Sequence, residues 1–178
     1  MEDRVIVDCS FSAIINAPFE RVDIPAWCFS LQDAEYQDCS PAHFAAGATT
    51  ARDGRRMSIN VEVIGGTPIV QHYVEVLAEK HHLILDSVSD LFTPAGRTKI
   101  LVRWELSVKP IGAGKCEFTN RVLSQASDEF LDFLARQGIP FEIFRAQRQP
   151  MTIGHNKQET PFFAASIERH ALRRAAAA

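Results

Sequence analysis

Alternation between apolar and polar residues is the feature of this sequence that most restricts its fold. The clearest case is segment 98–109, where every second residue belongs to one apolar set: Ile100, Val102, Trp104, Leu106 and Val108. A period of two is typical of a β-strand with one covered face. Turns rich in Gly, Pro and Asp separate the segments of this type. Together they predict seven strands, at residues 3–15, 43–51, 56–64, 69–79, 82–92, 98–109 and 115–126.

The composition supports one folded unit and argues against nucleic acid as a partner. The chain has 178 residues, of which 46% are hydrophobic, so it can bury a substantial core. Its net charge of −3 arises from 19 basic and 22 acidic residues, a balance that is unlike that of a phosphate-backbone binder. No stretch approaches the ~20 apolar residues of a membrane span, and no secretory leader pattern is present, so we expect a cytoplasmic protein.

The first strand passes directly into a helical segment at residues 12–22, SAIINAPFERV. Pro18 suits a first helical position because it lacks the N–H that would be unpaired there, and Glu20 favours the positive end of a helix dipole. Val22 to Pro25 then interrupts the helical pattern. Two short helices are therefore expected between the first and second strands.

The helical pattern returns after the seventh strand. Ser127 or Asp128 followed by Glu129 predicts a helix N-terminus. We expect interruptions at 138–140 and again at 150–154, because both contain Gly and Pro. In the last segment, Phe163, Ile167 and either His170 or Ala171 fall on one helical stripe.

These features resemble the START-related, or SRPBCC, helix-grip superfamily, which includes the major birch-pollen allergen and aromatic polyketide cyclases. The resemblance rests on INAPFERV at 15–22 and DAEYQDCSPAH at 33–43, with Cys39-Ser40-Pro41 where the family usually has an aromatic residue before Ser or Thr and Pro. It implies an α+β helix-grip fold, in which a curved seven-stranded antiparallel sheet wraps around C-terminal helices. It also implies a cavity between sheet and helix.

The resemblance divides the chain at residue 150. Residues 1–150 are expected to form the START-like helix-grip domain, with 128–148 covering the concave face. Residues 151–178 extend past the typical family end as a C-terminal helical extension. This extension would pack either on the same domain or on a partner subunit, the second case giving a homodimer.

Polar residues that share a strand face with apolar ones are the candidates for a ligand site. His72 lies among alternating valines, and Asn120 lies between Phe118 and Val122, so both are expected to point inward. There each either makes a satisfied hydrogen bond in the core or helps to orient a ligand. Strand 82–92 has no clear inward face. The predicted ligand-binding residues are His72, Trp104, Asn120, Phe118, Phe133, Phe144 and Trp27.

Local motifs for metal or nucleophilic chemistry are absent from the sequence. The six histidines show no H-x-x-x-H or H-E-x-x-H spacing, and there is no G-x-S-x-G. The four cysteines, Cys9, Cys28, Cys39 and Cys116, contain no C-x-x-C pair and are expected to act mainly as small buried hydrophobes. The sequence thus predicts no metal and no cofactor.

Three functions remain open at this stage. The first is a module that holds a hydrophobic small molecule, such as a lipid, polyketide, isoprenoid or aromatic compound. The second is a polyketide cyclase or dehydrase that uses the same cavity, with His72 as a weak candidate acid or base. The third is a regulatory or assembly protein with a vestigial pocket. We rank binding first, because His72 has no evident catalytic partner.

Overall fold

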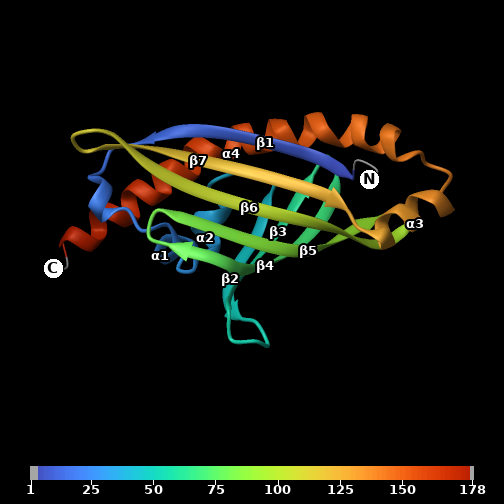
Figure 1. Cartoon of the computed structure of the whole chain (residues 1–178), viewed down its shortest axis with the longest axis horizontal. Helices are drawn as coiled ribbons and strands as arrows, with labels where there is room; N and C mark the ends of the chain where they lie inside the picture. Colours follow the sequence, from blue (N-terminus) through green and yellow to red (C-terminus); the bar gives the residue numbers. More distant parts are fainter. Residues whose placement is uncertain (1–3, 177–178) are drawn as a thin grey trace.

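The computed structural model describes residues 4–176 and consists of one sheet, a set of short helices and one long helix (Figure 1). The strands are β1 (Val5–Ile15), β2 (His43–Thr50), β3 (Arg56–Ile64), β4 (Thr67–Glu79), β5 (His82–Thr93), β6 (Gly96–Gly112) and β7 (Lys115–Ala126). The seven expected strands are confirmed, although the expected start at residue 3 lies outside the described residues. All neighbours pair antiparallel in the order β1-β7-β6-β5-β4-β3-β2.

Two α-helices and a 3-10 turn connect β1 to β2, as expected. The turn η1 (Phe19–Arg21) follows Pro18, and α1 (Ile24–Cys28) begins where the pattern is interrupted. The Asp23 side chain caps α1 by accepting a hydrogen bond of 3.0 Å from the backbone N–H of Ala26. Helix α2 (Asp33–Gln37) follows. These elements close one end of the sheet.

Helices α3 (Asp128–Arg136) and α4 (Phe141–Ala176) complete the chain, and α4 lies along the sheet (Figure 1). The break at 138–140 is confirmed, with Gly138 in a left-handed conformation at φ 66°. The break expected at 150–154 is wrong, because α4 runs through both Pro150 and Gly154. Proline removes one backbone hydrogen bond, but packing of buried residues on both sides, Arg148 and Thr152, keeps the helix continuous.

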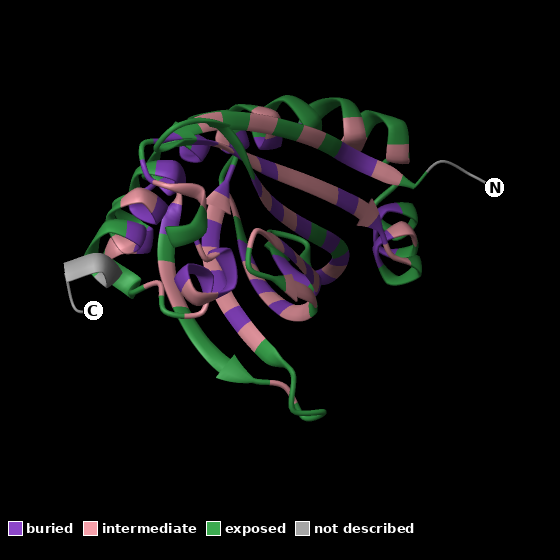
Figure 2. Ribbon diagram, turned by 60° about the vertical axis from the view of Figure 1, so that its left-hand side comes forward, coloured by how far each residue is buried: buried purple, intermediate pink, exposed green. Residues whose placement is uncertain are grey.

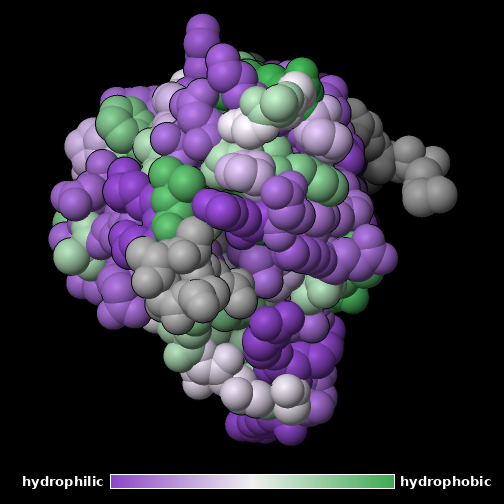
Figure 3. Space-filling view, turned by 90° about the vertical axis from the view of Figure 1, so that its left-hand side faces the viewer, coloured by the Kyte–Doolittle hydropathy of each residue, from purple (hydrophilic) through white to green (hydrophobic). Residues whose placement is uncertain are grey.

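The boundary expected between residues 150 and 151 therefore falls inside α4. The last part of this helix packs against its own chain, since Phe163, Ile167 and Ala171 are each only 1% exposed. This confirms the predicted stripe. The end of the molecule that carries the C-terminus is mostly hydrophilic (Figure 3), and the homodimer stays a prediction.

Buried and more exposed positions alternate along the strands (Figure 2). On β1, β6 and β7 the inward face is the one that the pattern predicts, with the β6 set from Ile100 to Val108 all buried. On β3 and β4 the same alternation would place inward the apolar sets that run from Met57 to Val63 and from Val70 to Val76, and this prediction is wrong. Here the inward residues are Ser58, Asn60, Glu62 and Ile64, followed by Ile69, Gln71 and Tyr73.

The reversed face on β3 and β4 has a physical cause. Most of their inward polar side chains have hydrogen-bond partners, either on the same strand or across the interior, although Gln71 Oε1 is buried without one. Tyr36 donates a hydrogen bond of 2.6 Å to Glu62, and Ser58 donates one of 2.8 Å to Asn60. The valines on the other face of these strands are partly exposed. Apolar alternation therefore marks the outer face in this part of the sheet.

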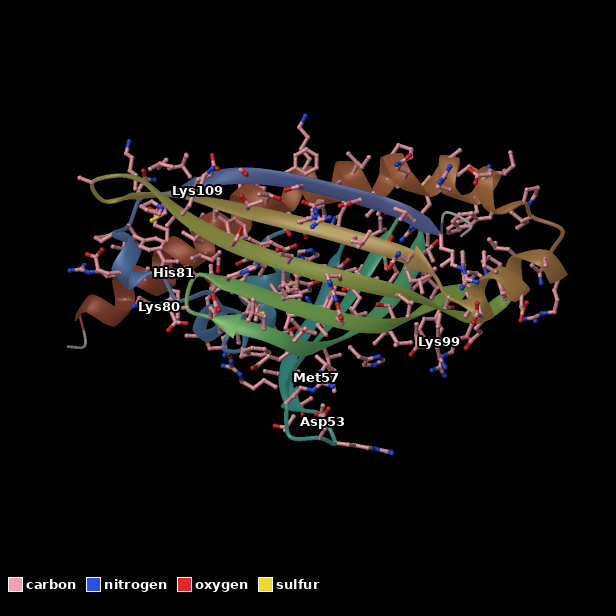
Figure 4. The ribbon with its side chains drawn as sticks, in the orientation of Figure 1. Asp53, Met57, Lys80, His81, Lys99 and Lys109 are labelled. Atoms are coloured by element: carbon pink, nitrogen blue, oxygen red, sulfur yellow. The ribbon has the colours of Figure 1, made fainter. Side chains whose placement is uncertain are left out.

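Three peripheral features complete the fold. Asp53 lies at the tip of the β2–β3 hairpin, which extends away from the rest of the sheet (Figure 4), and it pairs with Arg55 at 2.6 Å. All four cysteines are free, and three of them are buried, as expected. Among the described residues no helix combines the length and apolar character needed to cross a membrane.

Candidate functional site

A cavity lies between the concave face of the sheet and helix α4. Its apolar wall comes mainly from the strands and consists of Ile6, Ile64, Ile69, Leu91, Ile100, Val102, Trp104 and Val122, together with Phe144 of α4. Its polar wall contains Asn60, Glu62, Gln71, Tyr73, Ser124, Arg148, Thr152, His155, Asn156 and Glu159. A mostly apolar cavity with a few convergent polar groups is typical of small-molecule sites.

The cavity is small in this conformation. The volume open to the centres of water-sized spheres is about 40 Å³. Because one water molecule needs roughly 10–15 Å³ on this measure, the space holds a few waters. Cavities that enclose drug-sized ligands are larger, at roughly 300–1,000 Å³.

Four ionisable side chains, three of them buried and one only slightly exposed, meet at one part of the wall. His43 comes from β2, Glu62 from β3, and His155 and Glu159 from successive turns of α4. The His43 Nε2 atom lies 3.0 Å from Glu159 Oε2, and His155 Nε2 lies 3.2 Å from that oxygen and 3.6 Å from Glu62 Oε2. We call these four residues the His–Glu cluster.

Neighbouring residues hold the His–Glu cluster in place. Tyr36 stacks on His43 with ring centroids 3.9 Å apart, and its backbone carbonyl lies 2.8 Å from His43 Nδ1. Its hydroxyl also donates to Glu62. The side-chain amide of Asn120 on β7 donates a hydrogen bond of 3.1 Å to Glu159 and accepts one of 2.8 Å from Trp104 Nε1. A continuous network therefore links β6, β7 and α4.

Burial and mutual charge shift the pKa values of the cluster in different directions. Burial raises the pKa of Glu62 above its usual value. Burial also opposes ionisation of Glu159, but the two imidazoles outweigh it and hold the pKa of Glu159 well below its usual range. For His155, the two carboxylates outweigh burial and raise the pKa to about 8. Two glutamates a few ångströms apart thus differ strongly in their tendency to ionise.

Arg148 contributes a buried cation to the same cavity. It is 8% exposed, and its guanidinium donates a hydrogen bond of 2.6 Å to the backbone carbonyl of Ile64. Burial lowers the pKa of Arg148. This side chain fixes α4 to the end of β3 and places positive charge on the cavity wall.

The structure separates the seven predicted ligand residues into those that line the cavity, those that are buried elsewhere, and His72, which lies on the outer face of the sheet. Trp104 and Phe144 line the cavity. Asn120, Phe118, Phe133 and Trp27 are buried but do not line it, and the Trp27 Nε1 donates 2.8 Å to Ser166. Asn120 points inward, as predicted, and contacts the cavity only through Trp104 and Glu159.

The predicted inward orientation of His72 is wrong. The inward residues of β4 are Ile69, Gln71 and Tyr73, so His72 lies on the other face, in an open hollow that also contains Val74 and Val88. Its valine neighbours share this outer face, which is why the alternation pattern misled. His72 therefore has no place in the cavity.

The His–Glu cluster was missed because its members come from three distant segments. One signal within α4 could have indicated part of it. Arg148, Thr152, His155 and Glu159 recur at intervals of three and four residues, which places polar groups on the same helix face as the apolar stripe that begins at Phe163. A polar section in the buried face of an amphipathic helix is a candidate cavity wall.

Comparison with known proteins identifies the fold. No family model matches this sequence, and no curated protein matches it significantly. Among solved structures, the Zhui aromatase/cyclase from Streptomyces sp. R1128 superposes with a TM-score of 0.61 at 10% identity, covering 94% of both chains. A START superfamily protein from Mycobacterium smegmatis gives 0.53 at 16% identity, covering 94% of this chain and 98% of the other. The di-domain ARO/CYC StfQ of the steffimycin biosynthetic pathway gives 0.56 at 11% identity, covering 97% of this chain and 52% of the other.

These similarities show a shared fold. The chain has the helix-grip fold of the START-related, or SRPBCC, proteins, and the α+β architecture expected from the sequence is confirmed.

Proposed function

We propose that this protein binds a hydrophobic small molecule with one polar end in the cavity between the sheet and α4. The observation that carries the proposal is the mixed wall of this cavity, in which apolar side chains of the sheet lie beside polar side chains of α4, β3, β4 and β7. Burial of apolar ligand surface supplies affinity, and a few fixed polar groups orient the ligand.

The order of residues along α4 indicates how the ligand would be oriented. Phe144, Arg148, His155 and Glu159 follow one another on the cavity side of the helix. The polar residues from Arg148 to Glu159 extend over eleven residue steps of α-helix, which is about 16 Å, so polar groups follow the cavity along this part of α4. We propose that the apolar part lies against Ile100 and Val102 and that the polar end approaches the His–Glu cluster.

Binding of such a molecule requires side chains to move. The present volume of about 40 Å³ admits only a few waters. Phe144 is partly exposed and lies near the start of α4, next to the exposed residues Ile139 and Ile143. We propose that this end of the cavity opens, because Phe144 is one of the few wall residues that are not fully buried and its neighbours Ile139 and Ile143, outside the wall, are exposed.

The fold neighbours support the same class of function. One solved structure with this fold is a START superfamily protein, and two are aromatase/cyclases. A cavity between sheet and helix could hold a carried ligand or a substrate, so it is consistent with both a carrier and a cyclase.

A second candidate is a polyketide cyclase-like or dehydrase-like enzyme that uses the same cavity. The observation in its favour is that ionisable side chains, Glu62, His155 and Glu159, line the wall directly. Conversion of a poly-β-keto thioester analogue, followed by chromatography and mass spectrometry, distinguishes the enzyme from the carrier, because a carrier returns the analogue unchanged.

Binding can be tested with 1-aminoanthracene, a neutral aromatic amine that becomes fluorescent in apolar surroundings. We expect saturable binding and energy transfer from Trp104, which lines the cavity. Val102 is 5% exposed and lines the same wall, so V102F would fill the space and weaken binding at least tenfold.

The matched control is V88F, since Val88 is 54% exposed on the outer face of the sheet. It should bind the probe like the wild type. Equal binding by V102F and the wild type would refute the cavity as the binding place. Absence of saturable binding to the folded wild-type protein would favour a vestigial pocket.

A further inference from the structure

The His–Glu cluster presents four metal-ligating atoms to one point. One nitrogen each from His43 and His155 and one oxygen each from Glu62 and Glu159 all lie within 4.8 Å of one another. Three elements of the fold, β2, β3 and α4, supply them. The cluster is therefore created by the tertiary structure.

The distances between these atoms are close to those of a coordination shell. Ligand atoms that bind a Zn²⁺ ion tetrahedrally at about 2.1 Å lie about 3.4 Å from one another. The three measured separations within the cluster are 3.0, 3.2 and 3.6 Å. Small side-chain rotations would be sufficient to accommodate an ion.

Each of the four side chains is also held by a second contact. His43 Nδ1 faces the Tyr36 carbonyl, Glu62 accepts from the Tyr36 hydroxyl, and Glu159 accepts from Asn120. His155 Nδ1 lies 3.5 Å from Ser40 Oγ. Metal ligands typically have such outer partners, which fix the imidazole tautomer and the carboxylate orientation.

Both imidazoles direct their Nε2 atoms at the carboxylates. On a side chain that is 9% exposed, His155 Nε2 makes no hydrogen bond of good geometry, although it lies 3.2 Å from Glu159 Oε2 and 3.6 Å from Glu62 Oε2. His43 must donate from Nδ1 to the Tyr36 carbonyl, so in the neutral imidazole Nε2 carries a lone pair. That lone pair would face a carboxylate oxygen 3.0 Å away unless a cation lies between them.

Charge balance is compatible with a bound cation. Buried carboxylates need a proton or a nearby positive charge. Arg148 supplies one positive charge on the same wall, and a divalent cation between the four side chains would compensate both carboxylates directly. We propose that His43, Glu62, His155 and Glu159 bind one divalent first-row transition-metal ion, with Zn²⁺ as the reference ion.

The donor set determines the class of metal. Two imidazoles with two carboxylates suit Zn²⁺, Fe²⁺, Mn²⁺, Co²⁺ or Ni²⁺, whereas Mg²⁺ and Ca²⁺ prefer oxygen ligands and Cu⁺ prefers sulfur. Glu62, His155 and Glu159 also line the cavity, so the ion would lie at its wall. Metal binding does not require the proposed small-molecule ligand to be present, although the polar end of that ligand would face the same cluster. The sequence-based expectation of no metal considered only ligands that are close in sequence.

The proposal can be tested by titrating the chelator-treated, dialysed full-length protein with Zn²⁺ in a calorimeter. We expect one Zn²⁺ per chain and a higher melting temperature with the ion than without it. H155Q and E159Q should each weaken binding at least tenfold. Y36F, which removes an outer partner of Glu62, should weaken it by about 10–100-fold.

The matched controls come from a second His–Glu pair on another part of the sheet. His82 and Glu105 lie 2.8 Å apart and are partly exposed, so H82Q and E105Q should leave the stoichiometry and affinity unchanged. Should E159Q fail to fold, H155Q and the visible spectrum of Co²⁺ added to the wild-type protein still decide the question. A folded wild-type protein that binds no stoichiometric Zn²⁺ or Co²⁺ overturns the proposal, as does unchanged Zn²⁺ affinity in both H155Q and E159Q.

Discussion

Replacement of Asn120 by leucine should destabilise the fold well beyond an ordinary core substitution. Asn120 is completely buried, and its amide joins two structural layers. Its oxygen accepts from Trp104 Nε1 at 2.8 Å, and its nitrogen donates to Glu159 Oε1 at 3.1 Å and to Thr160 Oγ1 at 3.2 Å. Leucine has the same number of side-chain heavy atoms and the same branching at Cγ, so N120L removes these hydrogen bonds without creating a cavity.

The expected loss of unfolding free energy depends on which hydrogen-bond partners of Asn120 have no other partner. Thr160 keeps a hydrogen bond of 2.6 Å to the carbonyl of Asn156. The Trp104 N–H and one Glu159 oxygen are left unpaired, and each such buried group costs about 1–3 kcal/mol. We therefore expect N120L to lower the free energy of unfolding by about 2–6 kcal/mol, a large part of the ~5–15 kcal/mol of a typical domain.

Urea unfolding followed by circular dichroism measures this change. The matched control is Q125L on the same strand, since Gln125 lies on the outer face and should change stability by no more than about 0.5 kcal/mol. In the W104F/N120L double variant the loss should be smaller than the sum of the two single losses, because the unpaired N–H is gone. A change below about 1 kcal/mol in N120L would refute the network as a stabilising contact between sheet and helix.

Three further predictions concern other parts of the fold. Burial opposes ionisation of Glu35, but hydrogen bonds from Ser166 and Arg169 outweigh it and lower its pKa below 4.5. Its stabilising contribution is therefore complete above pH 4.5 and is lost as the pH falls through the lower folded-state pKa, so acid unfolding should be less pH-dependent in E35Q than in the wild type. An identical pH profile would contradict this. S127A removes the cap that accepts a hydrogen bond of 3.0 Å from the Phe130 N–H, and should cost about 0.5–2 kcal/mol in urea unfolding; no loss would show that the cap contributes nothing. Burial or partial burial raises the pKa of the Cys9, Cys28 and Cys39 thiols to about 11 or 12, so at pH 8 each is about 0.1% thiolate or less, and a disulfide reagent should label them slowly unless urea is added. Fast labelling of these three thiols in the native protein would contradict this.

Strand positions were predictable because each strand repeats a local signal. Alternation and turn residues located all seven strands within a few residues, and Gly138 with Pro140 marked the end of α3. The helix break predicted at Pro150 from the same local signals is wrong, because packing against the sheet outweighs the cost of one missing backbone hydrogen bond. A helix that packs against a sheet along its length tolerates an internal proline that would end an isolated helix.

The inward face of each strand was harder to predict. Trp104 and Asn120 share a face with apolar neighbours that are buried, so their orientation followed from the pattern. His72 shares a face with valines that are partly exposed, and its inward neighbour Gln71 is polar. A polar cavity wall reverses the usual rule that the more apolar face is the buried one.

The His–Glu cluster could not be predicted from spacing. Its histidines are 112 positions apart in the printed sequence, at 43 and 155. They meet because Tyr36 positions His43 from one side while α4 brings His155 and Glu159 from the other. The proximity of these side chains therefore depends on how α4 is positioned against the sheet, which residue spacing does not encode.

Native mass spectrometry of the protein purified from its own host tests the proposed binding function most directly. We predict that the wild-type chain carries an additional small-molecule mass under conditions that preserve non-covalent complexes. V88F should retain this mass and V102F should lose it, because only Val102 lines the cavity. A bare mass for the wild type, or an equal load on the wild type and V102F, would contradict the assignment of this cavity as a ligand site.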